Sequence, residues 1–252
     1  MILNITKHEI SLNFLTKRIW LALACTTVIF SLLYQWLLKQ FIIVSQAHIL
    51  EGTHMGVTEE ILHPYFAWLA IFLMCTLPIL TGYSIIKDRK SGVFLLYQLA
   101  PINLSKYLLG HFSAKITLSY IVISFLSLLP CIIAIDTHVD ILQLASAYIG
   151  IILLATCIIS ISTLSAVIAS NIISAMGITY LIIVSLTLLE WCAQFTNEYY
   201  YIIKSIALLS PIKNFLSGNI FAVDILYYVY ISAVCLILAV AILNSKEDRH
   251  GY

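Results

Sequence analysis

The chain has 252 residues, of which 62% are hydrophobic and 10% are charged. A soluble domain could not cover its surface with so few charged side chains, so the composition excludes a soluble globular protein and predicts a membrane protein. The net charge of +1 gives no indication of a nucleic-acid partner, and we expect none.

The first eighteen residues are mixed in character rather than apolar. Thr6 and Glu9 have the spacing of a helix capping box, and apolar and basic residues fall on opposite sides of a helix drawn through this segment. We therefore expect an N-terminal helix lying in the cytoplasmic interface of the membrane. A frayed tail is the alternative.

Six apolar runs of membrane-spanning length follow, at residues 19–38, 65–86, 116–135, 142–162, 172–189 and 225–243. Pro78 lies near the middle of the second run and predicts a bend that neighbouring helices can tolerate. None of the six runs contains an ionisable Asp, Glu, His, Lys or Arg side chain. This disfavours a proton- or sodium-coupled transporter, which would need such groups within the membrane.

The distribution of basic residues predicts the orientation. Ten of the thirteen Lys and Arg residues fall in the N-terminal segment, in residues 87–115 and in the C-terminal tail. Because basic residues mark the cytoplasmic side, we expect both termini and residues 87–115 to be cytoplasmic. The chain is predicted to be a single all-α transmembrane domain, residues 1–252, in the cytoplasmic (inner) membrane of a prokaryote.

Residues 87–115 form the long polar connection between the second and third spans. Breaks are expected at Ser91-Gly92 and at Pro101, and Asn103 is a candidate cap for a short helix. One face of that helix would carry Leu104, Tyr107, Leu108 and Phe112. The pattern predicts a short amphipathic cytoplasmic helix, separate from the third span that begins at residue 116.

The other connections are predicted to be of three kinds. Residues 40–64 read as an external loop. A short turn at residues 169–171 joins the fourth and fifth spans, where Ser162, Ala166, Ser170 and Ser174 recur at a spacing that favours close helix packing. Residues 190–224 are too apolar for a plain external loop and predict short helices dipping back into the outer interface, like a re-entrant segment.

Motifs for chemistry are missing from the sequence. No GxxxxGK[ST] phosphate loop occurs, and no nucleophile–base pair stands at a recognisable spacing, so we expect no enzyme activity and no cofactor. His48, His54 and His63 fall in the first external segment with Met55 and Glu59 nearby. Their spacing matches no compact metal motif, so we interpret them as loop polarity and predict no metal site.

Three short motifs stand in order on this topology. The first is Asp88-Arg89-Lys90-Ser91-Gly92, followed by Pro101-Ile102 and then by Leu109-Gly110-His111. The second is Ala169-Ser170-Asn171-Ile172-Ile173-Ser174-Ala175, and the third runs from Ser210-Pro211 to Gly218 and on to Asp224-Ile225-Leu226-Tyr227-Tyr228. With these motifs the sequence resembles the type-2 ABC transporter permeases over nearly its whole length, and within them the branch of the gliding-motility and nitrous-oxide-reductase-maturation permeases.

The chain departs from the pattern of that family at a few positions. His111 stands where the family has Lys, and Val93 and Leu95 stand where it often has Thr and Glu. These departures leave the expected fold unchanged and make the family's polar contacts at those positions uncertain in this chain.

The resemblance implies the permease subunit of an ATP-driven exporter, whose ATPase is a separate chain that docks on the cytoplasmic connection. It also implies a homodimer or a pair with a related permease in the lipid bilayer. The residues expected to couple to the ATPase are Lys87, Asp88, Arg89, Lys90, Gly92, Pro101, Leu104, Lys106, Leu108 and His111. The alternative is a membrane scaffold or assembly factor that recruits soluble partners without transporting anything.

Overall fold

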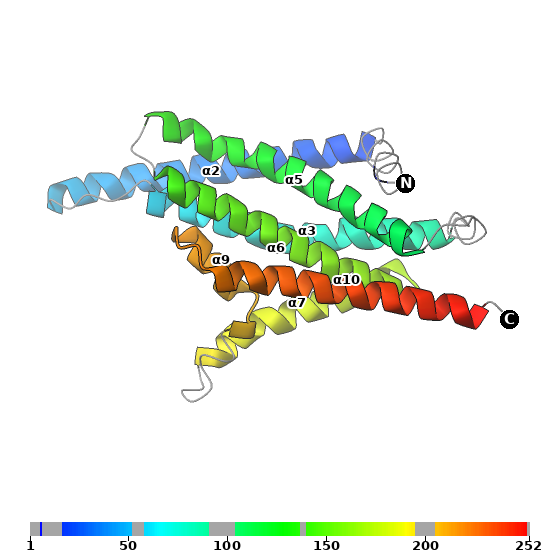
Figure 1. Ribbon diagram of the computed structural model, residues 1–252. Helices are drawn as coiled ribbons and strands as arrows, with labels where there is room; N and C mark the ends of the chain where they lie inside the picture. The colour runs from blue at the N-terminus through cyan, green and yellow to red at the C-terminus, as the bar shows by residue number, and fades with distance from the viewer. Residues whose placement is uncertain are drawn as a thin grey trace.

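The computed structural model describes residue 6 and residues 17–51, 58–90, 104–136, 140–194 and 205–250, and no strand occurs in these ranges (Figure 1). The helices are α2 (Lys17–Glu51), α3 (His63–Lys90), α5 (Leu104–Asp136), α6 (Ile141–Ile168), α7 (Ile172–Gln194), α9 (Leu209–Leu216) and α10 (Ala222–His250), with a π-helix, η1 (Thr58–Leu62), directly before α3.

Six of these helices, all except α9 and η1, are long and apolar enough to cross a membrane. This confirms the prediction of an all-helical protein with six helices of membrane-spanning length. The bounds differ from the prediction at several ends. The expected loop at residues 40–64 is wrong over residues 40–51, because α2 continues to Glu51, and over residues 58–64, which form η1 and the start of α3. Residues 41–44 are apolar and no glycine or proline stands before Gly52, so nothing in the sequence stops the helix there.

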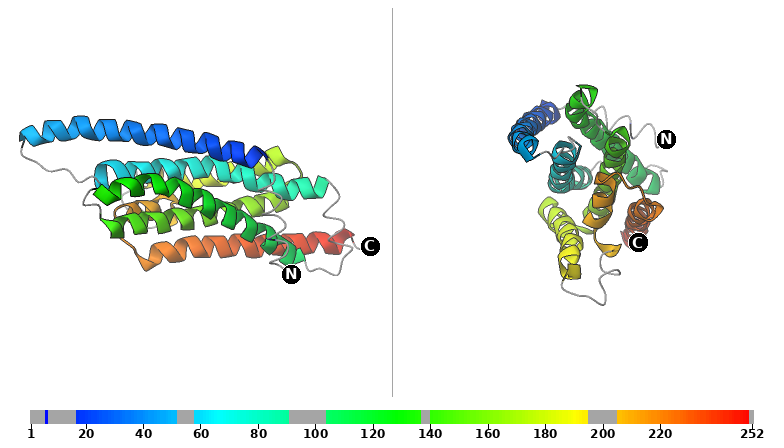
Figure 2. Two further views of the ribbon diagram at one scale, coloured as in Figure 1. Left: turned by 90° about the horizontal axis from the view of Figure 1, so that it is seen from above. Right: turned by 90° about the vertical axis from the view of Figure 1, so that its left-hand side faces the viewer.

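Helix α6 is the centre of the bundle. Of its most apolar stretch 72% is buried, against 11% for α2 and 17% for α7, so α6 is enclosed while those two lie at the edge. The end-on view in Figure 2 shows α2 and α7 at the periphery. Small side chains such as Ser146, Gly150 and Ala155 let the neighbours of α6 pack closely against it.

Two transmembrane helices contain a proline, and a tyrosine from another helix reaches the backbone beside each one. Pro130 in α5 has no N–H to donate to the carbonyl of Leu126, and the hydroxyl of Tyr65 in α3 donates to that carbonyl at 2.7 Å. Near Pro78 in α3, the Tyr180 hydroxyl of α7 donates to the carbonyl of Cys75. Each of the two proline-containing helices thus receives a hydrogen bond from a neighbouring helix close to its proline.

The short helix α9 packs into the bundle ahead of the last span. Its Phe215 and Leu216 are buried, and their carbonyls accept hydrogen bonds from Ser146 and Gln143 of α6, at 2.8 and 2.9 Å. Gly218 follows with a φ of 84°, a left-handed conformation that closes the helix and turns the chain toward α10. The sequence predicts short helices in residues 190–224, and α9 is one of them, whereas residues 190–194 belong to α7 and residues 222–224 to α10.

The bundle has two ends that differ in charge. We call one the basic end; it comprises residues 17–20, 87–90, 104–115, 166–174 and 244–250. The opposite end, called the α9 end, comprises residues 44–51, 58–65, 130–136, 140–146, 186–194 and 205–226. Helix α2 begins and α10 ends at the basic end (Figure 1). The grouping agrees with the predicted distribution of Lys and Arg; that the basic end faces the cytoplasm stays a prediction.

Candidate functional site

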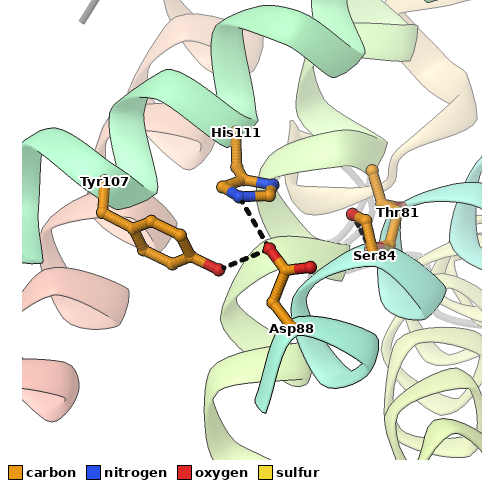
Figure 3. A network of polar contacts seen from close by, with 5 residues as sticks. All are labelled: Thr81, Ser84, Asp88, Tyr107 and His111. Carbon is orange, nitrogen blue, oxygen red and sulfur yellow. Dashed lines mark hydrogen bonds and ion pairs between the residues drawn. The ribbon is translucent and has the colours of Figure 1, made fainter. Parts of the chain in front are cut away.

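The basic end contains a polar network around Asp88, close to the end of α3 (Figure 3). The Tyr107 hydroxyl donates to Asp88 Oδ2 at 3.0 Å, and His111 Nε2 lies 3.1 Å from the same oxygen. Tyr107 and His111 are 1% and 2% exposed and stand one helical turn apart on α5, so they share one face. A single carboxylate of α3 thus holds two successive turns of α5.

Arg89, the next residue of α3, reaches in another direction. Its guanidinium nitrogens donate to the carbonyls of Ala166, Val167 and Ala169 at 3.2–3.3 Å. The last carbonyls of an α-helix have no partner within the helix and attract a cation. Arg89 therefore caps the end of α6 and fixes the turn that leads into α7.

Asp88 and Arg89 together tie the end of α3 to two other helices. Hydrogen bonds to charged groups contribute about 1.5–3 kcal/mol each, and we expect the lower value for Asp88, whose side chain is 18% exposed. The sequence places these two residues directly before the connection at 91–103 and Tyr107 and His111 soon after it. The end of α3 before that connection is thus bonded to the start of α5 after it, through Asp88. The end of α3 is also bonded to the end of α6, through Arg89.

A further contact involves the N-terminal segment. The hydroxyls of Thr6 and Ser113 are 3.3 Å apart, and either of them can donate. Ser113 lies on α5, near His111, so residue 6 meets the basic end. The rest of the predicted interfacial helix before residue 17 lies outside the described residues.

Leu108 excepted, the predicted coupling residues fall into four groups. Asp88, Arg89 and His111 lie in the network, and Lys87 and Lys106 are exposed beside it. Lys90 and Leu104 are helical, but their side chains are not described. Gly92 and Pro101 lie outside the described residues.

Two expectations about this region are wrong. Helix α5 is continuous from Leu104 to Asp136, so residues 104–115 are not a separate helix before the third span. The single glycine in this stretch, Gly110, is buried and does not interrupt the helix. Leu108 does not lie on an exposed docking face either. It is fully buried, in a cluster that includes Ile86 and Val167.

Sequence reasoning identified Asp88, Arg89 and His111 but not their partners. The spacing of Tyr107 and His111 is a signal that both point the same way. Nothing in the sequence indicates that Arg89 would meet the end of α6, since backbone carbonyls carry no sequence signature. From sequence alone, the basic residues near Asp88 would be interpreted as solvated surface charges. One of them, Arg89, instead caps the end of α6.

Among the described residues no group of three His, Cys, Asp or Glu side chains could hold a metal ion. His54 and Met55, part of the external set considered above, lie outside the described residues, and His63 is exposed at the start of α3. The candidate site is therefore the network at the basic end. No protein-family model matches the chain, and no curated protein matches it.

Proposed function

We propose that the chain is the permease subunit of an ATP-driven exporter in the inner membrane of a prokaryote, and that a separate ATPase docks on residues 87–115. One observation supports the proposal most directly. The two helices that flank the connection at 91–103, α3 and α5, are joined through Asp88, and Arg89 joins α3 to the end of α6. A force applied to this connection would reach three helices together.

The exposed side chains around the network are suited to contact a soluble partner. Lys87 and Lys106 are exposed, and Leu109 is 37% exposed. Exposed charges chiefly set the orientation and rate of association, while apolar contacts supply affinity. The docking surface proposed therefore includes Lys87, Lys106 and Leu109.

The proposal also includes pairing of two permease subunits. Helix α7 lies at the edge of the bundle with large exposed side chains, among them Ile173, Leu181 and Leu188, which are 84%, 70% and 52% exposed. In a bilayer such a face meets either lipid or another protein. A twofold dimer through α7 would suit an ATPase that works as a pair.

The test uses the tagged chain purified from its own membranes, with ATP hydrolysis and co-purified chains measured together. The chain alone should not hydrolyse ATP, and an ATPase with a phosphate loop should be retained with it. The double variant Lys87→Glu, Lys106→Glu should reduce retention and do so more at low salt, because exposed charges are screened by salt. Glu60→Lys at the α9 end is the control, since Glu60 is exposed and its charge reversal leaves the proposed docking surface unchanged.

The same measurement distinguishes the permease from the alternative function. A scaffold or assembly factor would retain soluble partners that lack ATPase activity, through the same surface. ATP hydrolysis by the isolated chain would contradict the proposal, and so would equal loss of the ATPase in the control variant.

A further inference from the structure

A crevice lies between α2, α3 and α5, with Ile159 of α6 among its lining residues. Its cavity volume is about 220 Å³. Ile79 and Leu80 line it and are also 47% and 40% exposed, so the crevice opens sideways on the surface that faces lipid. A cavity of about 150 Å³ is enough to bind a benzene molecule, so this one has room for part of a hydrocarbon chain.

The wall of the crevice is apolar even where polar residues line it. Thr26, Thr76 and Ser119 each donate the hydroxyl proton to a carbonyl of their own helix. None of these three donors is therefore directed to a guest molecule. The interior is suited to hydrocarbon and unsuited to a sugar, a peptide or a hydrated ion.

Lys115 is the one ionisable residue in the lining, and it is 8% exposed. On α5 it is the last residue of the basic end, and Val122 is the lining residue farthest from that end. The two residues are seven positions apart, or about 10 Å along the helix, against about 15 Å for half of the hydrocarbon core of a bilayer. The crevice thus has the Lys115 side chain at one end and apolar walls running toward the middle of the membrane.

We propose that this crevice binds a single-chain anionic amphiphile of the fatty-acid type. The hydrocarbon chain lies along α3 and α5, and the carboxylate meets the ammonium group of Lys115. An ammonium group has three N–H donors, so it can hold a headgroup together with another contact. The volume suits one chain rather than the two of a phospholipid. The site is independent of the proposed ATPase.

The experiment uses the full chain in phosphatidylcholine nanodiscs with a diazirine-tagged palmitate. Photolabelled peptides are mapped by mass spectrometry, and palmitate, hexadecanol and phosphatidylglycerol serve as competitors. Label should map to residues 72–81 and 115–122, and palmitate should compete about tenfold better than hexadecanol, as expected of one charge-assisted hydrogen bond. Lys115→Met should abolish that difference, while Lys106→Met, on the same helix outside the crevice, should preserve it.

A second variant, Val122→Phe, fills the crevice without replacing Lys115 and should reduce labelling by the tagged palmitate. Three results would overturn the proposal. They are equal competition by palmitate and hexadecanol in the unaltered protein, labelling that does not respond to Val122→Phe, and phosphatidylglycerol competing as well as palmitate.

Discussion

Asp88 is the residue on which the basic end depends most directly. It accepts from Tyr107 and lies against His111, both nearly fully buried. Asp88→Ala should lower the free energy of unfolding by about 1.5–3 kcal/mol, because buried donors lose a charged acceptor. The measurement is thermal unfolding in detergent. The exposed neighbour Lys87→Ala should change stability by no more than about 0.5 kcal/mol; similar losses in both variants would contradict the assigned network.

A second prediction for single residues concerns Tyr65, whose hydroxyl bonds the backbone one turn before Pro130. Tyr65→Phe should cost about 1 kcal/mol of stability, because the Leu126 carbonyl loses its hydrogen bond. Pro130→Ala restores an N–H that can bond this carbonyl within α5. In a double-mutant cycle the cost of Tyr65→Phe should therefore shrink when Pro130 is replaced. Tyr230→Phe, at a residue 70% exposed, is the control. Additive effects of the two replacements would refute the explanation.

At the scale of elements, two glycines form a matched pair. A Cβ on Gly150 of α6 would stand 2.6 Å from the Cβ of Phe215 in α9, whereas a Cβ on Gly177 of α7 would meet nothing within 4 Å. Gly150→Ala should destabilise the protein by about 1–3 kcal/mol through overpacking. Gly177→Ala should stabilise it by up to about 1 kcal/mol, since alanine favours a helix. Unfolding of both variants in parallel tests whether α9 is seated on α6.

The helices show what could be predicted from sequence and what could not. The six apolar runs give the spans, because length and hydropathy decide membrane insertion. The ends of the helices are harder to predict. Residues 41–44 belong to α2 and residues 104–115 to α5, although polar residues next to them favour a loop or a break in the helix. The burial of Leu108 and the cap formed by Arg89 depend on how helices meet, which no pattern in a single sequence specifies.

At the scale of the whole molecule, the orientation can be tested directly. Single cysteines at Lys106 and Lys213, in a background without the six native cysteines, report the basic end and the α9 end respectively. A membrane-impermeant thiol reagent applied to intact cells should label only the cysteine at position 213, because basic residues stay in the cytoplasm. Opening the cells should expose position 106. Labelling of position 106 in intact cells would reverse the predicted orientation.

In the proposed mechanism, a conformational change of the ATPase moves the basic end, and with it α3, α5 and the end of α6. This mechanism is tested most directly by hydrogen exchange at the α6–α7 turn, residues 169–171, in the complex with its ATPase, with and without ATP. In the unaltered complex, ATP should change hydrogen exchange at this turn. The variant Arg89→Met should retain the ATPase yet lose that change, because the contact between α3 and the end of α6 is gone. The same ATP-dependent change in Arg89→Met would contradict the mechanism.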